Sequence, residues 1–419
     1  MAVACSNASP QFLMKVAYLN PIGTIGGAER SLLDMMASLK QHRPEIQQHL
    51  VVGTHGELAK RAMPFATVHV LEMPEDLRQI GDSAASEAGV FSKFQLAAKL
   101  AAAGWNGTQY VGRLRQTLAE INPDVVHSNG FKMHLLGAHA KPAGTPLVWH
   151  VRDYVTTRFV MSKALRSTAQ ACTQAIAITK SVAKDLSVAC PGLPIETIED
   201  AIDIDHFRPD GPRLDLDQIS NLNPAPNGTV RVGLVATFAK WKGQDVFLQA
   251  LSKISAQSPV RGYIIGGPVY QTSGSQWSLQ ELQTMSRQLG LTIGFTGFVD
   301  SASAMRALDI VVHASVKPEP LGLVIPEAMA CGKPVVVANA GGAAEMYTDR
   351  VDALGYRPGD ADDMATVISE LIDNEALRAR LSAVSPQHVA KRFDRARWGH
   401  QLPTMYETLT RRTSLRMVA

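Results

Sequence analysis

The sequence lacks the features of membrane-spanning and secreted proteins. No apolar run reaches the roughly 18 residues that a spanning helix needs, and the start, MAVACSNASPQFLMK, has no basic stretch followed by a sustained apolar core. Cysteine is scarce: the four cysteines of the 419 residues have neither paired nor metal-like spacing. We therefore expect a cytoplasmic protein with reduced thiols.

The sequence also lacks a large excess of charge of one sign, low-complexity tracts and heptad repeats. The net charge of +3 gives no support to a nucleic-acid partner, and none is expected. A hydrophobic fraction of 46% with 19% charged residues is typical of a folded enzyme. At about 150 residues per domain, the length predicts two or three domains, and two is the first choice.

Apolar strands alternate with amphipathic helices in two successive series, which predicts an α/β fold of two doubly wound parallel sheets. The first domain is expected over residues 1–206. A segment rich in Pro, Asn and Asp, 207–228, reads as a linker before a second domain over 229–395. The final segment, 396–419, is amphipathic and is expected to pack back onto the first domain. Such domain pairs bind ligands in the cleft between them.

The most informative segment is PEPLGLVIPEAMACGKPVVV, in which Glu319 and Glu327 lie eight positions apart. Pro326 fits the first position of a short helix, and Gly332 fits its left-handed cap. The amides of Leu323 and Val324 are then expected near the positive helix end, where an anion can bind.

The two acids allow three interpretations. Glu327 could accept hydrogen bonds from a vicinal diol, or it could only interact with the helix dipole. Glu319 and Glu327 could also form the acid and base of a hydrolase, although a carboxylate on a buried helix end suits hydrogen bonding better than proton transfer.

Two loops are candidates for phosphate binding. Gly26 and Gly27 join a strand to a helix, so their amides can approach a phosphate closely. A double glycine by itself more often marks a plain tight turn, but its position opposite a second doubly wound domain favours a function. Lys242 precedes Gly243 in the matching loop of the second series, where a lysine can neutralise a phosphate or remain solvated beside Lys240.

Two histidines end predicted strands of the first series. His150 ends PLVWHV and is followed by Arg152 and Asp153, and His127 lies near the end of DVVHSN. A lone histidine is more often a packed residue than a functional one, but two at neighbouring strand ends favour a function, with His150 the stronger candidate.

Three tripeptides have the Asp-x-Asp form that holds a divalent metal in some transferases: Asp203-Ile204-Asp205, Asp215-Leu216-Asp217 and Asp360-Ala361-Asp362. Such tripeptides are common by chance. We predict that the protein uses no metal and no other cofactor.

Nearly the whole chain resembles the retaining glycosyltransferases of family GT4, which have the GT-B fold. The motifs that carry the resemblance occur in the family's order: GGAER, PLVWHVRD, DIDHFRPD, KWKGQDVFLQAL, IIGGP, FTGFVD, PEPLGLVIPEAMACGKPVVVANAGGAAEM and YRPGD. The two glutamates match the family's EX7E motif.

The resemblance implies roles for individual residues. Glu327 would bind the ribose and Glu319 the donor sugar, while Gly267 and Phe298 would frame the base. The amides of Leu323 and Val324, those of the Gly26–Gly27 turn, and Lys242 would hold the diphosphate, beside the turn at Gly322. His150 would face the donor sugar near the reacting carbon.

The implied reaction needs no carboxylate nucleophile, because front-face attack is assisted by the leaving phosphate.

The chain departs from the family's pattern at three places. A second phosphate-binding arginine is missing at Ala236 and Thr237, where Lys240 could substitute. The usual Asn-Gly near the domain exchange is Asp200-Ala201, and the aromatic residue usual before Gly322 is Leu321.

We expect a hexosyltransferase that uses a nucleotide sugar, UDP-linked or alternatively GDP-linked, and a carbohydrate or lipid-linked hydroxyl acceptor. Two alternatives remain: a hydrolase or phosphorylase on the same fold, and a nucleotide-sugar-binding protein without turnover. Basic and aromatic residues within 71–112 suit peripheral contact with the inner membrane face, or else a partly buried helix. Oligomeric state, linkage and sugar identity are left open.

Overall fold

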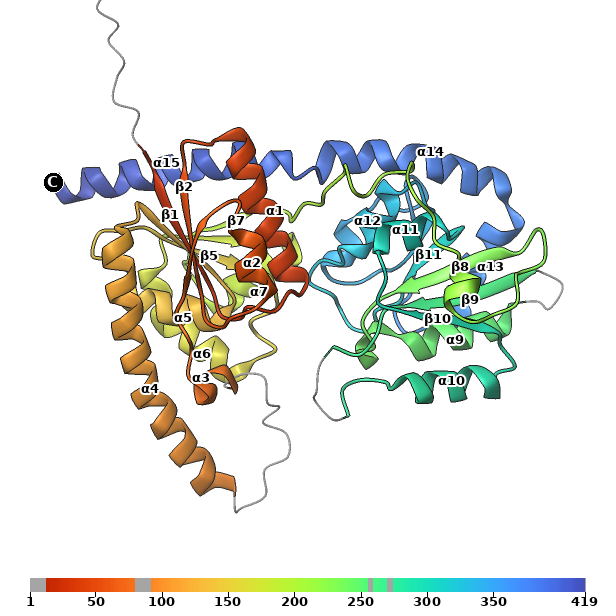
Figure 1. The fold of residues 1–419 in the computed structure, drawn as a ribbon, viewed down its shortest axis with the longest axis horizontal. Coiled ribbons are helices and arrows are strands. Elements are labelled where there is room, and N and C mark those ends of the chain that lie inside the picture. The colour runs from red at the N-terminus through yellow and green to blue at the C-terminus, as the bar shows by residue number, and fades with distance from the viewer. Residues whose placement is uncertain (1–12, 80–91, 255–258, 270–273, 419) are drawn as a thin grey trace, which may run out of the picture. The chain divides into compact units, whose positions relative to one another are not determined.

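The computed structural model describes residues 13–79, 92–254, 259–269 and 274–418 (Figure 1). Its contacts divide the chain into two units. The first consists of Met1–Ile178, Ala183–Ile198 and Ala396–Ala419, and the second of Thr179–Val182 and Glu199–Arg395.

The first unit is built on a seven-stranded parallel sheet with the order β3-β2-β1-β4-β5-β6-β7. Its strands are β1 (Lys15–Asn20), β2 (Gln47–Val52), β3 (Thr67–Val70), β4 (Val125–Asn129), β5 (Leu147–Val151), β6 (Gln174–Ala177) and β7 (Ile195–Thr197). The helices in this part of the chain are α1 (Gly27–His42), α2 (Glu57–Ala62), α3 (Glu75–Gln79), α4 (Ser92–Ile121), α5 (Phe131–Ala140), α6 (Phe159–Thr168), η1 (Ala169–Ala171), α7 (Lys180–Ala189) and α15 (Ala396–Val418).

Helices cover both faces of this sheet, which is why successive residues of a central strand, such as Val16–Leu19 of β1, are apolar and buried. Neighbouring residues of a strand point to opposite faces. On β4, His127 contacts Tyr406 of α15, whereas Ser128 contacts His134 of α5. The α15 helix therefore covers one face and α5 the other.

The C-terminal helix α15 packs against α1 within the first unit (Figure 1). Its apolar stripe is buried through Trp398, Leu402, Tyr406 and Leu409. A Cβ atom at Gly399 would lie 2.7 Å from the ring of His42 on α1, so glycine at this position permits the close approach of the two helices.

The second unit is built on a six-stranded parallel sheet with the order β10-β9-β8-β11-β12-β13. Its strands are β8 (Val230–Val235), β9 (Val260–Ile265), β10 (Ile293–Gly297), β11 (Ile310–His313), β12 (Val335–Ala338) and β13 (Leu354–Tyr356). Its helices are α8 (Leu216–Ile219), η2 (Lys240–Lys242), α9 (Gln244–Lys253), α10 (Leu279–Gln288), α11 (Ser301–Arg306), α12 (Val324–Ala330), η3 (Gly342–Glu345), α13 (Ala361–Asp373) and α14 (Glu375–Arg392).

Residues 207–228, interpreted from the sequence as a linker, belong to the second unit and contain α8. The buried Asp217 of α8 accepts hydrogen bonds from Tyr263 Oη and Arg261 Nη1, each at 2.7 Å. Arg231 also donates to this carboxylate. Charge pairing and tyrosine hydroxyl bonding thus fix this segment to the neighbouring strands β8 and β9.

The prediction of two doubly wound parallel sheets is confirmed. The strands β7 and β13 have three residues each, which is too short for a hydrophobic period to be visible in the sequence. In the part of the chain that the structure describes, no helix is both long and apolar enough to cross a bilayer.

Candidate functional site

The buried carboxylate of Glu319 lies at the centre of a cluster of polar side chains in the second unit. Glu319 Oε1 accepts a hydrogen bond from Lys242 Nζ at 2.5 Å. Its Oε2 atom accepts one from His313 Nε2 at 2.7 Å and one from Ser315 Oγ at 2.5 Å. His313 ends β11, so this cluster forms at the carboxyl edge of the sheet, where ligands bind in open α/β folds.

Lys242 reaches this carboxylate because a glycine follows it. Gly243 has φ +73°, and a Cβ atom there would lie 2.0 Å from the carbonyl oxygen of Ala314. Any larger residue would push η2 away from the segment that follows β11. The Trp241 carbonyl also accepts a hydrogen bond from the Val316 amide. The KG pair is therefore a close-packing device as well as a source of charge.

The backbone of Glu319 is held by the double glycine of the AGGAAE segment. The Gly342 amide donates a hydrogen bond to the Glu319 carbonyl at 2.7 Å, and Glu319 forms an isolated parallel β-bridge with Gly341. A Cβ atom at Gly342 would lie 1.8 Å from the Pro320 carbonyl oxygen. Both the main chain and the side chain of Glu319 are thus fixed.

The cluster keeps Glu319 ionised. Burial alone would raise the pKa of this carboxyl, but the charge of Lys242 and the hydrogen bonds from His313 and Lys242 outweigh it and hold the pKa well below its usual range. A carboxylate that accepts this many hydrogen bonds is a poor base and a poor nucleophile. It is suited to accepting further hydrogen bonds in place of those from Lys242.

The short helix α12 follows this carboxylate, but it begins earlier than the sequence predicts. Leu323 is its N-cap and Val324 its first residue, so Pro326 is the third helical residue, and the prediction that it is the first was wrong. Proline is tolerated there because the amides of the first turn have no partner within the helix. Gly332, at φ +67°, adopts the predicted left-handed cap.

The two glutamates both lie in the protein interior beside this turn. Glu327 lies in the first turn of α12 with 6% of its surface exposed, and Glu319 is 8% exposed. Gly322 before the helix has φ +88°, and a Cβ atom there would lie 3.3 Å from His313 Nε2. The turn therefore packs directly on the histidine that holds Glu319.

The structure also brings Gly267 and Phe298 together at the neighbouring strand ends. A Cβ atom at Gly267 would lie 2.8 Å from Cε2 of the Phe298 ring, and this ring is 66% exposed. A flat, exposed ring beside a bare backbone is an arrangement on which a planar group can stack. Lys240 Nζ lies 4.6 Å from the centre of the Trp277 ring, so a cation–π contact holds this lysine.

In the first unit, the predicted His150 lies in a buried hydrogen-bonded group at the ends of β4 and β5. Its Nδ1 atom lies 3.1 Å from His127 Nε2 and 3.2 Å from Arg152 Nη2. His127 Nδ1 lies 2.6 Å from Tyr406 Oη of α15. Burial lowers the pKa of His127 to about 3 and that of His150 well below its ordinary value, so both rings are neutral.

Asn129 ends β4 directly beside His150 in the register of the sheet. Both polar atoms of its amide are buried and have no partner among the described residues. An unpaired buried polar group costs about 1–3 kcal/mol. Such costs are unusual in native proteins and mark this strand end as a candidate ligand contact.

The glycine turn before α1 binds a carboxylate of its own helix. Gly26 is the N-cap of α1 and Gly27 its first residue. The Gly26 amide donates to Glu29 Oε2 at 3.0 Å, and the Asn20 side chain donates to the Ile22 carbonyl at 2.8 Å. The Gly26 amide is therefore engaged inside the chain, and a Cβ atom at Gly27 would meet no atom within 4 Å.

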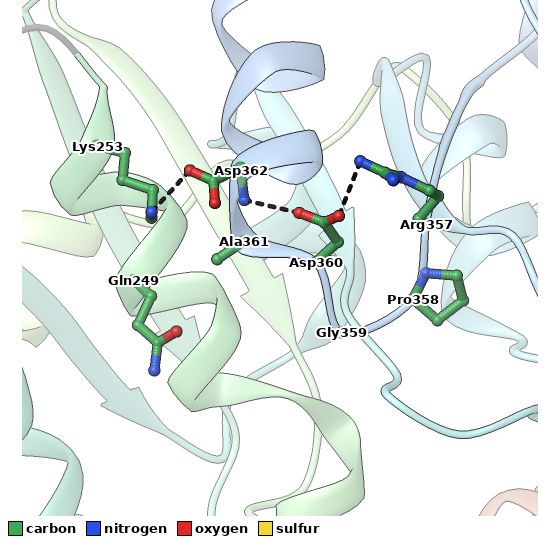
Figure 2. Close-up of a pocket in the computed structure, with 8 residues that line it drawn as sticks. All are labelled: Gln249, Lys253, Arg357, Pro358, Gly359, Asp360, Ala361 and Asp362. Atoms are coloured by element: carbon green, nitrogen blue, oxygen red, sulfur yellow. Dashed lines mark hydrogen bonds and ion pairs between the residues drawn. The ribbon is translucent and has the colours of Figure 1, made fainter.

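Each Asp-x-Asp tripeptide has a structural role. Asp215 caps α8, and Asp203 pairs with Arg395. Figure 2 shows the third, in a shallow depression of about 560 Å³ between α9 and the start of α13. There Asp360 caps α13 and pairs with Arg357, and Asp362 pairs with Lys253 at 2.7 Å. The charges of this depression neutralise one another.

Sequence reasoning missed His313, Ser315, Asn129 and Tyr406. His313 and Ser315 lie in DIVVHAS, which reads as an ordinary buried strand. Their signal was a histidine and a serine at the carboxyl end of a strand, the same signal that identified His150. Tyr406 carried no local signal, because it acts through the packing of α15.

Two parallel α/β sheets, each with polar side chains gathered where its strands end, define a two-domain enzyme of the GT-B class. HepE of Anabaena, solved in complex with UDP-glucose, has this fold with a TM-score of 0.74 at 25% identity, covering 94% of this chain and 100% of that chain. Sucrose-phosphate synthase from Thermosynechococcus elongatus shares the fold at 16% identity, with a TM-score of 0.74 and coverage of 94% and 99%.

The family follows from matches to both halves. A model described as Glycosyltransferase Family 4 matches residues 25–206, and one described as Glycosyl transferases group 1 matches residues 217–388. The chain belongs to these GT4-type glycosyltransferases, which confirms the resemblance seen in the sequence.

Curated relatives match over part of the chain. D-inositol 3-phosphate glycosyltransferase 2 of Catenulispora acidiphila is 33% identical over 213 residues, which is 47% of each chain. The D-inositol 3-phosphate glycosyltransferase of Mycolicibacterium smegmatis is 31% identical over 52% of this chain and 48% of its own length. The chain thus spans about half the length of the curated relatives it matches.

Proposed function

We propose that this protein transfers a sugar from a nucleotide diphosphate donor, UDP-linked rather than GDP-linked, to a hydroxyl acceptor with retention of the anomeric configuration. The observation that carries this proposal is the Lys242–Glu319 pair. It combines, at one strand edge, a cation for a diphosphate and an ionised carboxylate for sugar hydroxyls. The UDP-glucose complex of HepE supports the choice of nucleotide.

The residues that bind the nucleotide sugar then contact different parts of it. Lys242 and the amides of Gly27, Leu323 and Val324 hold the diphosphate, next to the turn at Gly322, and Glu319 holds the sugar. A separate pair of groups serves the nucleoside. Glu327 binds the ribose, and the exposed Phe298 ring stacks on the base above Gly267.

Donor binding must separate Lys242 from Glu319. In this structure each neutralises the other. A diphosphate competes for the lysine, and a sugar hydroxyl replaces the lysine as a donor to Glu319 Oε1. His313 and Ser315 continue to hold Oε2, so the carboxylate keeps its orientation throughout.

The chemistry that fits this cluster is direct transfer. The bond between the sugar C1 and the diphosphate oxygen breaks, the acceptor oxygen bonds to C1 on the same face, and the acceptor proton passes to the leaving diphosphate. Lys242 stabilises the charge of the leaving group, the role that a metal has in other transferases. The engagement of the Asp-x-Asp carboxylates in caps and ion pairs supports a metal-free reaction.

The acceptor is a hydroxyl-bearing carbohydrate or lipid-linked compound, as in polysaccharide or glycolipid synthesis. The curated relatives are named for D-inositol 3-phosphate, which supports a hydroxyl-bearing acceptor. The amide of Asn129 carries one donor group and one acceptor atom, the pattern that a hydroxyl group matches. The free thiols of Cys172, Cys190 and Cys331 support a cytoplasmic location.

Calorimetric titration with UDP and with uridine tests the donor assignment. Lys242→Ala is expected to weaken UDP binding by roughly ten- to a hundredfold, the value of a charged hydrogen bond, and to leave uridine binding unchanged. Lys253→Ala, which removes a surface lysine paired with Asp362, is the matched control and should affect neither ligand. Equal weakening of UDP and uridine would show that Lys242 does not bind phosphate.

A second experiment tests turnover and stereochemistry. Incubation with UDP-glucose and a panel of hydroxyl acceptors should yield a glycoside whose anomeric configuration, read by proton NMR, matches that of the donor. Tight donor binding without any transfer would favour a nucleotide-sugar-binding protein. Cleavage of the donor without an acceptor would favour a hydrolase.

A further inference from the structure

Four side chains of the first unit form a continuous ladder of contacts. Arg152 and His150 come from the end of β5, His127 from β4 and Tyr406 from α15. The three links are Arg152 Nη2 to His150 Nδ1 at 3.2 Å, His127 Nε2 to His150 Nδ1 at 3.1 Å, and Tyr406 Oη to His127 Nδ1 at 2.6 Å. Both imidazoles and the tyrosine are fully buried.

The chemistry of arginine sets the direction of this ladder. A guanidinium can only donate hydrogen bonds. His150 Nδ1 must therefore be the acceptor, and a neutral His150 carries its proton on Nε2. Because Nδ1 of His150 accepts, Nε2 of His127 must be the donor in the second link.

The same reasoning fixes the last link. A neutral His127 that carries its proton on Nε2 has a lone pair on Nδ1, so Tyr406 donates its hydroxyl proton there. The positions of the protons on both histidines and on the tyrosine therefore follow from the Arg152 guanidinium, the one group that cannot accept a hydrogen bond. The opposite tautomer of His150 would place an N–H group against the Arg152 guanidinium.

Both ends of the ladder are anchored on helices that pack together. Arg152 Nη1 donates to Ser31 Oγ of α1 at 2.7 Å, and Tyr406 belongs to α15, which packs on α1. Trp398 and Leu402, buried on the same helix, hold this stretch of α15 in place. The C-terminal helix thus supplies the final hydrogen-bond donor to a group at the carboxyl edge of the sheet.

We propose that His127 and Tyr406 are positioning residues that hold His150 as a neutral hydrogen-bond donor through Nε2. This inference rests on the proposed sugar transfer, together with the role that the family resemblance implies for His150, which is contact with the donor sugar near the reacting carbon. In this state His150 donates a hydrogen bond to a substrate oxygen and takes no proton from the acceptor. The acceptor proton therefore passes to the leaving diphosphate, and α15 is required for the orientation of His150 as well as for stability.

Nitrogen NMR of the full-length protein with ¹⁵N-labelled histidine tests the ladder directly, because ring ¹⁵N chemical shifts distinguish protonated from unprotonated nitrogens. At neutral pH, His150 and His127 should each show a protonated Nε2 and an unprotonated Nδ1. Resonances are assigned by their loss in His127→Gln and His150→Asn. A wild-type His150 protonated on Nδ1 would overturn the inference whatever the activity.

Tyr406→Phe tests the positioning role. Without its donor, His127 can move its proton to Nδ1, and the tautomers of both histidines should become mixed. We expect kcat to fall roughly tenfold while the KM for UDP-glucose stays the same. His127→Gln keeps an N–H donor near His150 Nδ1 and should retain more activity than His127→Leu.

Tyr110→Phe is the matched control, because Tyr110 is also a buried tyrosine of the first unit and its hydroxyl donates to the Leu71 carbonyl at 3.1 Å. It should leave the histidine tautomers and kcat unchanged. Equal loss of kcat in Tyr110→Phe and Tyr406→Phe, with unaltered tautomers in both, would reduce Tyr406 to a structural residue. Full turnover by His150→Asn would instead refute the proposed role of His150, while the tautomers still report on the ladder.

Discussion

The two units place polar clusters at the carboxyl edge of the same kind of sheet, yet the clusters differ in the charge of their central side chains. In the first unit, His127 and His150 are neutral because burial lowers their pKa values. In the second, Lys242 and His313 hold Glu319 ionised despite burial. The carboxyl edge of a parallel sheet therefore fixes where ligand chemistry occurs, and the side chains decide which chemistry it is.

This difference matches the two halves of the proposed reaction. A diphosphate brings negative charge, and a charged cluster can exchange its own ion pair for it. A hydroxyl acceptor is neutral, and the neutral imidazoles of the first cluster can bind it without the cost of a further buried charge. Substitutions in each cluster test whether this contrast holds.

The largest effect is expected from Glu319→Gln, which removes the charge at the centre of the second cluster. We expect kcat/KM to fall by roughly 10² to 10³-fold, because the carboxylate would no longer bind the sugar. Stability should fall by about 3 kcal/mol, since Lys242 would lose its partner in a mostly buried site. Urea unfolding and steady-state kinetics measure the two changes.

The double variant Glu319→Gln/Lys242→Met provides the control for that substitution. Removal of the lysine should restore part of the lost stability but none of the activity. If the double variant is as unstable as the sum of the single variants, the two residues do not form a coupled pair.

The two clusters should lose stability in different pH windows. The pKa of His127 falls to about 3 on folding from a value of 6.5, so the unfolded chain binds a proton that the folded chain does not between these values. The free energy of unfolding therefore decreases as the pH falls below 6.5, by up to about 1.4 kcal/mol per pH unit for this residue. The Glu319 carboxyl, whose pKa is lowered from 4.5, contributes a loss only below that value.

Urea unfolding at pH 7.5, 6.5 and 5.5 checks this assignment. His127→Gln removes the titrating ring and should show a shallower decline than the wild type between pH 6.5 and 5.5. An identical pH dependence in both proteins would contradict a neutral His127.

Gly243→Ala should disturb the second cluster alone. The left-handed backbone costs an alanine about 1–2 kcal/mol, and the added methyl group would also collide with the Ala314 carbonyl. Lys242 should move away from Glu319, and UDP binding should weaken roughly tenfold.

Gly290→Ala, in the loop after α10, is the matched control for Gly243→Ala, because Gly290 also has a positive φ of +68° but has open space around it. Its free energy of unfolding should fall only by the cost of the left-handed backbone, and UDP binding should be unchanged. Equal effects of the two alanines would show that the close approach at Gly243 is unimportant.

Asp360→Ala should have the smallest effect. It removes the cap of α13 in the depression of Figure 2, where the charges neutralise one another. We expect the melting temperature to fall by at most a few degrees, with no change in UDP binding or turnover. A loss of UDP binding would place ligand chemistry at this depression instead of the Glu319 cluster.

Features of the fold and of the candidate site that leave a local signal could be predicted from the sequence. The strands Lys15–Asn20 and Val230–Val235 consist mostly of apolar residues, and the glutamates of the second unit lie in a recognisable loop. Pro326 was placed two positions too early in its helix, because a proline is compatible with any residue of the first turn.

Features that depend on distant packing could not be predicted. The need for glycine at 243 comes from the carbonyl of Ala314, and the ladder to His150 depends on Tyr406, more than 250 positions along the chain. Neither close approach leaves a periodic pattern in the sequence. Sequence reasoning therefore identified several residues of each cluster but not the neighbours that hold them.

Amide hydrogen exchange of the full-length protein, with and without saturating UDP, tests whether the donor binds at the charged cluster of the second unit. We expect UDP to slow exchange in residues 240–243 and 319–327, which contain the lysine and the two glutamates. Saturating UDP that leaves both segments unchanged, and protects amides elsewhere, would contradict the assignment of the donor to the charged cluster.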